Sequence, residues 1–279
     1  MTNILHAISN FSKYNITSIG THYKNTIRIQ QVGDSLEYFI KDLLADTLNK
    51  SMREKDEKYS ECFSYLGGTN NPPDLMIKKG DAWEIKKIEH TGGQIALNSS
   101  FPKQRLYRDD SFINNFCRDC EKWEEKDIVY AVGTIDKKTN DIASLWMVYG
   151  DCYCANKETY NRIKEKISNG VNGIKGVEFS ETKELGRVNK IDPLGITYLR
   201  IRGMWGIEHP ANVFGYLLDN HEDNILNVIM LKEKLMSFDT KDIDLIKDDE
   251  NIKINEIKIK CPDNPALLMD AVHISIKRG

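Results

Sequence analysis

The sequence predicts an α/β fold, or the related α+β class, in which helices flank a central mixed β-sheet. Segments with helical periodicity and short apolar runs typical of strands alternate along all 279 residues, and such a mixture packs helices against a sheet. The chain contains seven prolines, with neither a low-complexity linker nor a repeat of about 20 to 50 residues. We therefore expect one domain over residues 1–279, with insertions.

Composition narrows the possible function classes. Hydrophobic residues make up 40% of the chain and charged residues 29%, which excludes collagen-like, mucin-like and wholly disordered proteins. The formal net charge is −3, from 39 Lys and Arg against 42 Asp and Glu, so a nucleic-acid-binding surface has to be a local positive patch.

The sequence also indicates a cellular compartment. No apolar run approaches the roughly 18 residues of a membrane-spanning helix. The start MTNILHAISNFSKYN lacks the basic and apolar regions of a signal peptide. Six cysteines are too few for a disulfide-stapled secreted domain, so we expect a cytoplasmic protein with reduced thiols and no membrane partner.

The first clear helix is predicted to begin near Asp34. Apolar residues fall on one of its faces, namely Leu36, Ile40, Leu43, Leu44 and Leu48. Asp34 is placed to cap the first turn, with Glu37 three residues later as in a capping box.

A β-hairpin is predicted between residues 64 and 89, and further elements alternate after it. A Gly/Asn/Pro-rich loop leads into DLMI, the turn signal KKGD and then AWEIKKIE, the pattern of two strands joined by a tight turn. Helices are predicted at 111–126 and 155–168. Other strands are predicted at 127–134, 144–149, 197–207, ILNVIML, INEIKIK and HISIK, with a charged connection from Ser237 to Asn251.

The hairpin gathers two carboxylates and one ammonium. Asp74 follows Pro73 at the start of the first strand, and Glu84 and Lys86 lie two residues apart on the second. Side chains alternate along a strand, so Glu84 and Lys86 project from the same face. A turn at Lys79-Gly80 lets Asp74 approach Glu84 across the pair.

This trio suits hydrolysis of a phosphodiester. Two carboxylates hold Mg²⁺, a hard cation that prefers oxygen ligands, and the backbone carbonyl of Ile85 offers a further oxygen. The cation polarises the phosphate and lowers the pKa of bound water, while Lys86 orients that water or stabilises charge on phosphorus. The competing interpretation is a solvated strand, because Glu-x-Lys is a common pattern.

The same residues carry a resemblance to a known family. Pro73-Asp74 and Glu84-Ile85-Lys86 match the PD-(D/E)xK nuclease signature. The longer runs NPPDLMIKKGDAWEIKKIE, ALNSSFPK and ELGRVNKIDPLGITYLRIRGMWGIEHP resemble the NgoPII-type restriction endonucleases, Type II enzymes that cut DNA at GGCC. The resemblance covers about residues 30–215 and is less clear in the C-terminal third.

The resemblance implies a restriction-endonuclease-like PD-(D/E)xK core at about residues 30–150 and a Mg²⁺-dependent double-strand endonuclease. Its active site would be Asp74, Glu84 and Lys86. Nucleases of this superfamily often add an acidic residue from the preceding helix, a place that Glu37 occupies here; the alternative for Glu37 is the capping box. A palindromic target has a two-fold axis, which implies a homodimer, and a cognate DNA methyltransferase is expected without a stable complex.

DNA-reading elements are expected at 180–215, with the C-terminal third as a second place. Arginine presents a fork that matches O6 and N7 of guanine, and Asn and Lys commonly contact bases and phosphates. An ion-paired surface near Glu181 and Glu184 is the alternative. The candidates are Arg187, Asn189, Lys190, Tyr198, Arg200 and Arg202.

Two further segments carry candidates with plain alternatives. The loop SSFPKQRLYR at 99–108 holds Lys103, Arg105 and Arg108, which would grip phosphates or simply be solvated. A CxxC at Cys117 and Cys120 and a CxC at Cys152 and Cys154 would together form a zinc site, or would be buried free thiols.

Two rival functions remain open at this point. One is a DNA-binding relative that does not cleave, which the intact Asp74, Glu84 and Lys86 disfavour. The other is a repair nuclease of the same fold that selects DNA structure rather than sequence.

Overall fold

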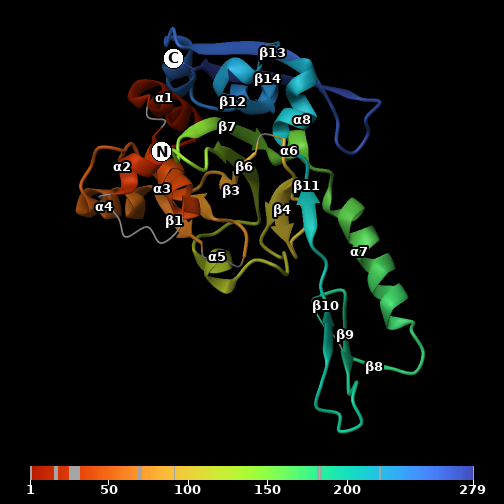
Figure 1. Ribbon diagram of the computed structural model, residues 1–279. Helices are drawn as coiled ribbons and strands as arrows, with labels where there is room; N and C mark the ends of the chain where they lie inside the picture. The colour runs from red at the N-terminus through yellow and green to blue at the C-terminus, as the bar shows by residue number, and fades with distance from the viewer. Residues whose placement is uncertain are drawn as a thin grey trace.

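The computed structural model describes residues 2–15, 18–24, 32–67, 71–90, 92–180, 182, 184–219 and 221–278. The predicted α/β architecture is confirmed: a large mixed sheet forms the body, with helices packed around it (Figure 1). No helix in these ranges is long and apolar enough to cross a bilayer.

The central sheet has the strand order β1-β2-β3-β6-β7-β12-β14-β13. Its strands are β1 (Phe63–Leu66), β2 (Leu75–Ile77), β3 (Ala82–Ile88), β6 (Glu125–Ile135), β7 (Ile142–Tyr149), β12 (Asn224–Leu231), β13 (Ile252–Lys260) and β14 (Leu268–Lys277). β3 pairs with β6 and β7 with β12 in parallel, and the other neighbours along this order are antiparallel. The short β5 (Arg105–Tyr107) adds to β6. The middle strands β6, β7 and β12 are mostly buried on both faces, which is why they appear as nearly continuous apolar runs.

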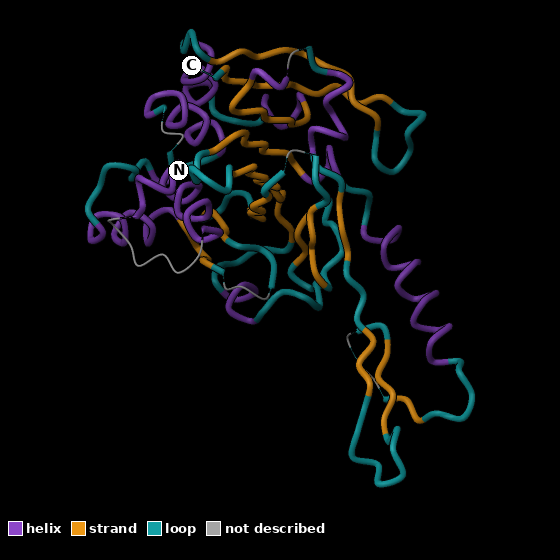
Figure 2. Tube along the Cα trace, in the orientation of Figure 1, coloured by secondary structure: helices purple, strands orange, loops and turns teal. Residues whose placement is uncertain are grey.

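Four helices gather at the N-terminal end of the body (Figure 2). They are α1 (Ile4–Tyr14), α2 (Ile19–Lys24), α3 (Val32–Ala45) and α4 (Met52–Cys62). α3 packs on β3, and Leu36 lies so close to Gly133 of β6 that a Cβ at Gly133 would sit 2.7 Å from the Leu36 side chain. Glycine at this position therefore lets the helix approach the sheet.

A buried carboxylate joins three of these helices. Asp42 of α3 is fully buried and accepts hydrogen bonds from Tyr23 (2.5 Å), Thr47 (2.5 Å) and Tyr59 (2.6 Å), and it pairs with the ammonium of Lys55. Every donor comes from a different part of 23–59, so this network fixes how α2, α3 and α4 sit together.

An arm projects from the body (Figure 1). It consists of α7 (Lys157–Asn172), β8 (Glu178–Phe179), β9 (Gly186–Asn189) and β10 (Leu199–Ile201), with the strand order β10-β9-β8. None of the described residues of α7 is buried. After the arm the chain returns to the body, where β11 (Trp205–Ile207) pairs with β4 (Ile95–Asn98).

The remaining elements are short. They are α5 (Asn115–Asp119), α6 (Gly150–Tyr153), α8 (Pro210–Phe214), α9 (Lys232–Met236), α10 (Thr240–Lys247) and the 3₁₀ turns Gly215–Leu217 and His221–Asp223.

The sequence-based elements need four corrections. The helix expected near Asp34 begins at Val32, so Asp34 is its third residue rather than its cap, and the Asp34 side chain lies outside the described part of the chain. The helix expected at 111–126 shrinks to α5, because residues from Glu125 onward pair with β5 instead.

The other two corrections concern the second half of the chain. The strand expected at 197–207 splits into β10 in the arm and β11 in the body, because the two halves pair with different partners. The charged connection 237–251 contains the helix α10, whose Ile246 is buried. The other predicted elements, including the hairpin and the three C-terminal strands, are confirmed.

We predict that Asp42→Asn destabilises the protein strongly. The change leaves the Lys55 ammonium buried without a counter-charge, which costs about 3–5 kcal/mol of unfolding free energy. Urea denaturation measures the loss. The exposed pair Arg53–Glu57 on α4 provides the control, because Arg53→Ala should cost no more than about 0.5 kcal/mol. Equal losses for the two variants would contradict the role assigned to Asp42.

Candidate active site

The β2–β3 hairpin sets the geometry of the site. Leu75 lies opposite Trp83 in the antiparallel register, and the Asp74 N–H donates to the Trp83 carbonyl at 2.9 Å. Continuing the register by one residue places Asp74 opposite Glu84. The turn uses a left-handed residue, Lys79 with φ 54°, before Gly80, which confirms the turn predicted there.

Two contacts hold the three charged side chains together. The Ile85 N–H donates to Asp74 Oδ2 at 2.5 Å, and Lys86 Nζ lies 2.6 Å from Glu84 Oε1. Trp83, which precedes Glu84 and projects from the opposite face of the strand, is fully buried in the core. The predicted alternation is therefore confirmed: Glu84 and Lys86 share one face of β3.

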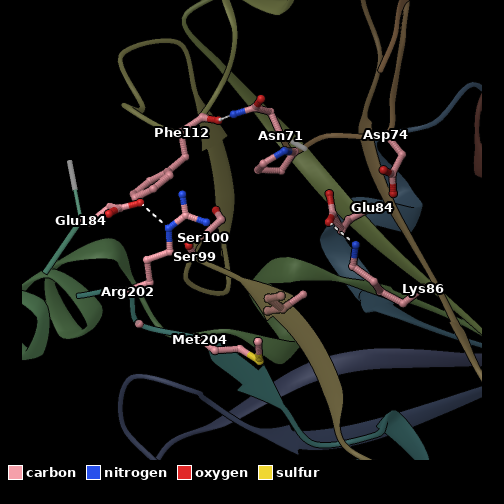
Figure 3. A pocket seen from close by; sticks show the side chains of 13 residues that line it. Asn71, Asp74, Glu84, Lys86, Ser99, Ser100, Phe112, Glu184, Arg202 and Met204 are labelled. Atoms are coloured by element: carbon pink, nitrogen blue, oxygen red, sulfur yellow. Dashed lines mark hydrogen bonds and ion pairs between the residues drawn. The ribbon is translucent and has the colours of Figure 1, made fainter. Parts of the chain in front are cut away.

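Asp74, Glu84 and Lys86 line a cavity of about 710 Å³ (Figure 3). The far wall comes from the loop after β4, from Phe112 and from the base of the arm. The lining residues are Asn71, Pro72, Asp74, Glu84, Lys86, Leu97, Ser99, Ser100, Phe112, Glu184, Arg202, Gly203 and Met204.

The electrostatics of the cavity show an unbalanced negative charge. Burial raises the pKa of Asp74 to about 7, the neighbouring Glu84 carboxylate adds to the rise, and Lys86 opposes it. Burial alone would lower the pKa of Lys86, but the carboxylates of Glu84 and Asp74 outweigh burial and raise it. Lys86 thus stays an ammonium at neutral pH, while Asp74 and Glu84 compete for one positive charge.

This arrangement fits a hard cation. Glu84 Oε2 is buried and has no hydrogen-bond partner among the described residues, and it belongs to the carboxylate opposite Asp74. A buried, unpaired carboxylate oxygen beside a second carboxylate is the donor set that Mg²⁺ prefers. No group of three or more His, Cys, Asp or Glu side chains within the described ranges is gathered as a metal site, so the protein would contribute two carboxylates.

Glu37 lies near this site without lining the cavity. It is close enough to raise the pKa of both Asp74 and Lys86 slightly. Its own carboxylate pairs with Lys41 at 2.5 Å, one turn along α3. Glu37 therefore contributes negative potential, and a direct catalytic role for it stays a prediction.

The predicted DNA-reading residues lie on the arm and at its base. Arg200 and Arg187 are register partners on β10 and β9, and the Arg187 guanidinium stacks 4.3 Å over the Tyr198 ring. Asn189 accepts from Arg187 Nε at 3.2 Å, and Lys190 pairs with Glu178 at 2.7 Å.

Arg200 and Arg202 both pair with Glu184. The ion-paired surface considered for this segment is thus present at Glu184, and Glu181 lies outside the described residues. Both guanidiniums stay about half exposed, at 48% and 57% of their side chains, so ion pairing does not remove them from the surface. Of the six predicted residues, Arg202 alone lines the cavity of the carboxylates.

The loop at 99–108 does not present the expected row of free cations. Lys103 is buried, pairs with Asp110 and lies over the Phe101 ring, so its predicted phosphate contact is wrong. Arg105 pairs with Asp127 at 2.7 Å and stays partly exposed. Arg108 pairs with Asp119 at 3.2 Å.

The zinc hypothesis for the cysteines is wrong for the described residues. Cys117 belongs to α5, where its Sγ contacts Met76 of β2, whereas Cys152 and Cys154 lie at α6, which packs on β6, β7 and β12, and the described residues contain no gathered group of metal-ligating side chains. All are free thiols, and burial raises the pKa of Cys117 to about 12. They pack as small apolar residues.

Several cavity residues carried no functional prediction. Asn71 donates from its side chain to the Phe112 carbonyl at 2.6 Å, bridging the hairpin loop and the opposite wall. Ser99 and Ser100 lie inside the run ALNSSFPK, whose similarity to the family was the signal that could have found them. Met204 likewise lies in the run ELGRVNKIDPLGITYLRIRGMWGIEHP, whereas Phe112 had no signal, because only the folded chain brings it to this cavity.

Comparisons with known proteins agree on one family. The family model of the NgoPII restriction endonuclease matches residues 2–260. The Type II restriction enzyme NgoPII of Neisseria gonorrhoeae is 47% identical over 271 residues, which cover 96% of this chain and 97% of that protein. The similarity therefore extends further into the C-terminal third than the sequence runs indicated. No solved structure matches the chain.

We predict that Asp74→Asn stabilises the metal-free protein in a pH-dependent way. The raised pKa means that the folded state binds a proton more tightly than the unfolded state, so wild-type stability falls as pH rises through the interval up to about 7. The amide of Asn cannot ionise, so the stability of the variant does not fall over this pH interval. Unfolding free energies in EDTA should favour the variant at about pH 8, and the advantage should shrink at about pH 5. A pH-independent difference would contradict the electrostatic account.

Proposed function

The chain belongs to the NgoPII restriction endonuclease family and is thus a Type II restriction endonuclease; from that premise we propose that it cuts both strands of DNA at the palindrome GGCC. The proposed catalytic residues are Asp74, Glu84 and Lys86, with Mg²⁺ as the cofactor. The observation that carries this assignment is the meeting of two carboxylates and one ammonium in a single cavity, with one buried carboxylate oxygen unpaired.

Each side chain has a distinct task in this mechanism. Asp74 and Glu84 hold the cation, and the Ile85 carbonyl is available beside them. Bound Mg²⁺ supplies a Lewis acid that polarises the scissile phosphate and favours ionisation of water. Lys86, held by Glu84 at 2.6 Å, donates hydrogen bonds to the attacking water or to the phosphate oxygens as charge builds on phosphorus. Glu37 adds negative potential from α3.

The proposal includes the PD-(D/E)xK identity of the core. The strand pair β2–β3 carries the signature residues, α3 precedes it and β6 continues the sheet in parallel, which supports a core at about 30–150 within one domain of residues 1–279. DNA reading is assigned to 180–215, which spans the arm strands and the return to the body.

Charge supports the arm as the DNA-binding element. Residues 157–203 contain ten Lys and Arg against six Asp and Glu, in a chain whose net charge is −3. Positive charge is thus concentrated on the part that projects from the body, as a local patch for a polyanion requires. Arg187, Asn189, Lys190, Tyr198, Arg200 and Arg202 stay the proposed contacts, and Arg105 and Arg108 are the remaining candidates from the 99–108 loop.

Partners follow from the symmetry of the target. A palindrome has a two-fold axis, so a homodimer places one cavity on each strand. We propose double-stranded DNA as the substrate, the cytoplasm as the place of action, and a DNA methyltransferase of the same specificity in the same system without a stable complex.

We predict that Asp74→Ala and Glu84→Ala abolish cleavage, because each removes a cation ligand. Lys86→Ala should lower the cleavage rate by about 10²-fold or more, the usual cost of losing one preorganised donor. The measurement is digestion of a sequenced plasmid with Mg²⁺ or EDTA, followed by sequencing of the fragment ends.

The adjacent lysine provides the control for this experiment. Lys87→Ala removes an ammonium from the other face of β3 and should leave the rate within a few-fold of wild type. Near-normal cleavage by Asp74→Ala would refute the site. A smear of products, or a requirement for branched DNA, would favour the structure-selective nuclease, and DNA binding without any cleavage would favour the non-cleaving relative.

We further predict that Arg200→Ala and Arg202→Ala erase preference for GGCC over duplexes with one changed base. A bidentate arginine–guanine pair discriminates by about 1–3 kcal/mol. Competition binding in Ca²⁺ at two salt concentrations measures the preference. Lys190→Ala serves as the comparison, because loss of a phosphate contact weakens all duplexes alike and flattens the salt dependence. If the arginine variants also weaken binding to all duplexes alike, Arg200 and Arg202 contact phosphates and other residues read the bases.

A further inference from the structure

One carboxylate organises both candidate guanine-reading arginines. Glu184 Oε1 lies 2.7 Å from Arg200 Nη2 and 2.6 Å from Arg202 Nε, and Glu184 Oε2 lies 3.0 Å from Arg200 Nε. The Glu184 side chain is only 11% exposed. The carboxylate therefore sits behind two exposed guanidiniums, and hydrogen bonds from Arg200 hold the pKa of Glu184 below its usual value.

This cluster stands where the arm meets the catalytic cavity. Glu184 and Arg202 line the same cavity as Asp74, Glu84 and Lys86, on the opposite wall (Figure 3). The backbone joins the start of β9 to the end of β10 here, because the Leu185 N–H donates to the Ile201 carbonyl at 3.0 Å. Just after Arg202 the chain enters β11, which pairs with β4 of the body, so this end of the arm is anchored beside the cavity.

We propose that Glu184 is a positioning residue for sequence recognition, which orients Arg200 and Arg202 towards guanines beside the scissile phosphate. The proposal rests on the proposed function and adds to it the residue that sets the geometry of reading.

A guanidinium has two donor edges, so one arginine can bind Glu184 and a guanine at the same time. Glu184 occupies the side edge of Arg200, formed by Nε and Nη2. The end edge, formed by Nη1 and Nη2, stays available, and two parallel N–H groups on one edge are what O6 and N7 of guanine accept. Arg202 meets the same carboxylate through Nε, which leaves its Nη1–Nη2 edge for a second partner.

Charge and entropy favour such an arrangement. Two guanidiniums around one carboxylate keep a net positive charge, so the cluster still attracts DNA. Holding long side chains in place before binding removes part of the rotamer entropy that binding would otherwise cost. A fixed donor edge also discriminates better, because a flexible arginine can shift to a phosphate or to a wrong base.

A different role for Glu184 makes the opposite prediction. If its carboxylate imitated a phosphate and neutralised the arginines until DNA displaced it, removing its charge would strengthen binding to every duplex. Positioning instead requires that its removal weaken the preference for the correct sequence.

The test is Glu184→Gln, with Glu178→Gln as the matched control. Glu178 pairs with Lys190 on the same arm, so the control variant also removes one negative charge beside a basic residue of the arm. The readout is the ratio of affinities for a GGCC duplex and a one-base-changed duplex, measured by competition in Ca²⁺. Glu184→Gln should lower this ratio about tenfold, while Glu178→Gln should leave it unchanged.

A double variant separates positioning from general loss of structure. If Glu184 acts through Arg200, then Glu184→Gln added to Arg200→Ala should lower the ratio by much less than the product of the two single effects. An unchanged ratio in Glu184→Gln would overturn the proposal, and so would a rise in affinity for all duplexes at constant ratio. Wild-type protein with no preference for GGCC would instead contradict the proposed function itself, so the two failures are distinguishable.

Discussion

The site depends on one structural constraint: the antiparallel register of β2 and β3. That register places Asp74 opposite Glu84, and it holds because Trp83 on the other face of β3 is fully buried in the core. A slip of one residue would turn Trp83 to solvent and Glu84 into the core. The free energy of burying one large aromatic side chain therefore fixes the position of two carboxylates that, by themselves, repel each other.

The hairpin was predictable from sequence because its determinants are local. Turn residues, strand alternation and the Asp74–Glu84–Lys86 spacing all lie within a short run, and each has a physical meaning that needs no distant partner. The central strands β6, β7 and β12 were also predictable, because strands buried on both faces leave long apolar runs. The family resemblance then added the chemistry of the substrate, which no periodicity contains.

Two of the errors arise from pairing that the folded chain decides. Residues 197–207 form one β-rich run, yet β10 pairs with β9 and β11 with β4, so the run divides between the arm and the body. Lys103 belongs to a polar loop, yet Asp110 and the Phe101 ring draw its ammonium inside. Sequence spacing cannot show either result, because the partner that decides each one is selected by the fold.

The arm raises the question of how recognition is coupled to cleavage across a large cavity. The two walls of the cavity come from segments about a hundred residues apart: the hairpin supplies Asp74, Glu84 and Lys86, and the base of the arm supplies Glu184 and Arg202. Their separation is therefore set by packing of the body and not by either segment alone.

DNA bound to the arm alone would meet the carboxylates only if its backbone lay along this cavity. On the proposed assignment, arginines that read bases at the arm's base would also place the phosphate. A wrong base that displaced the duplex from Arg202 would move the scissile bond away from Lys86, so binding energy at the bases would be converted into alignment at the reacting atoms. Specificity in cutting would for this reason exceed specificity in binding, and the proposed role of Glu184 would contribute to both.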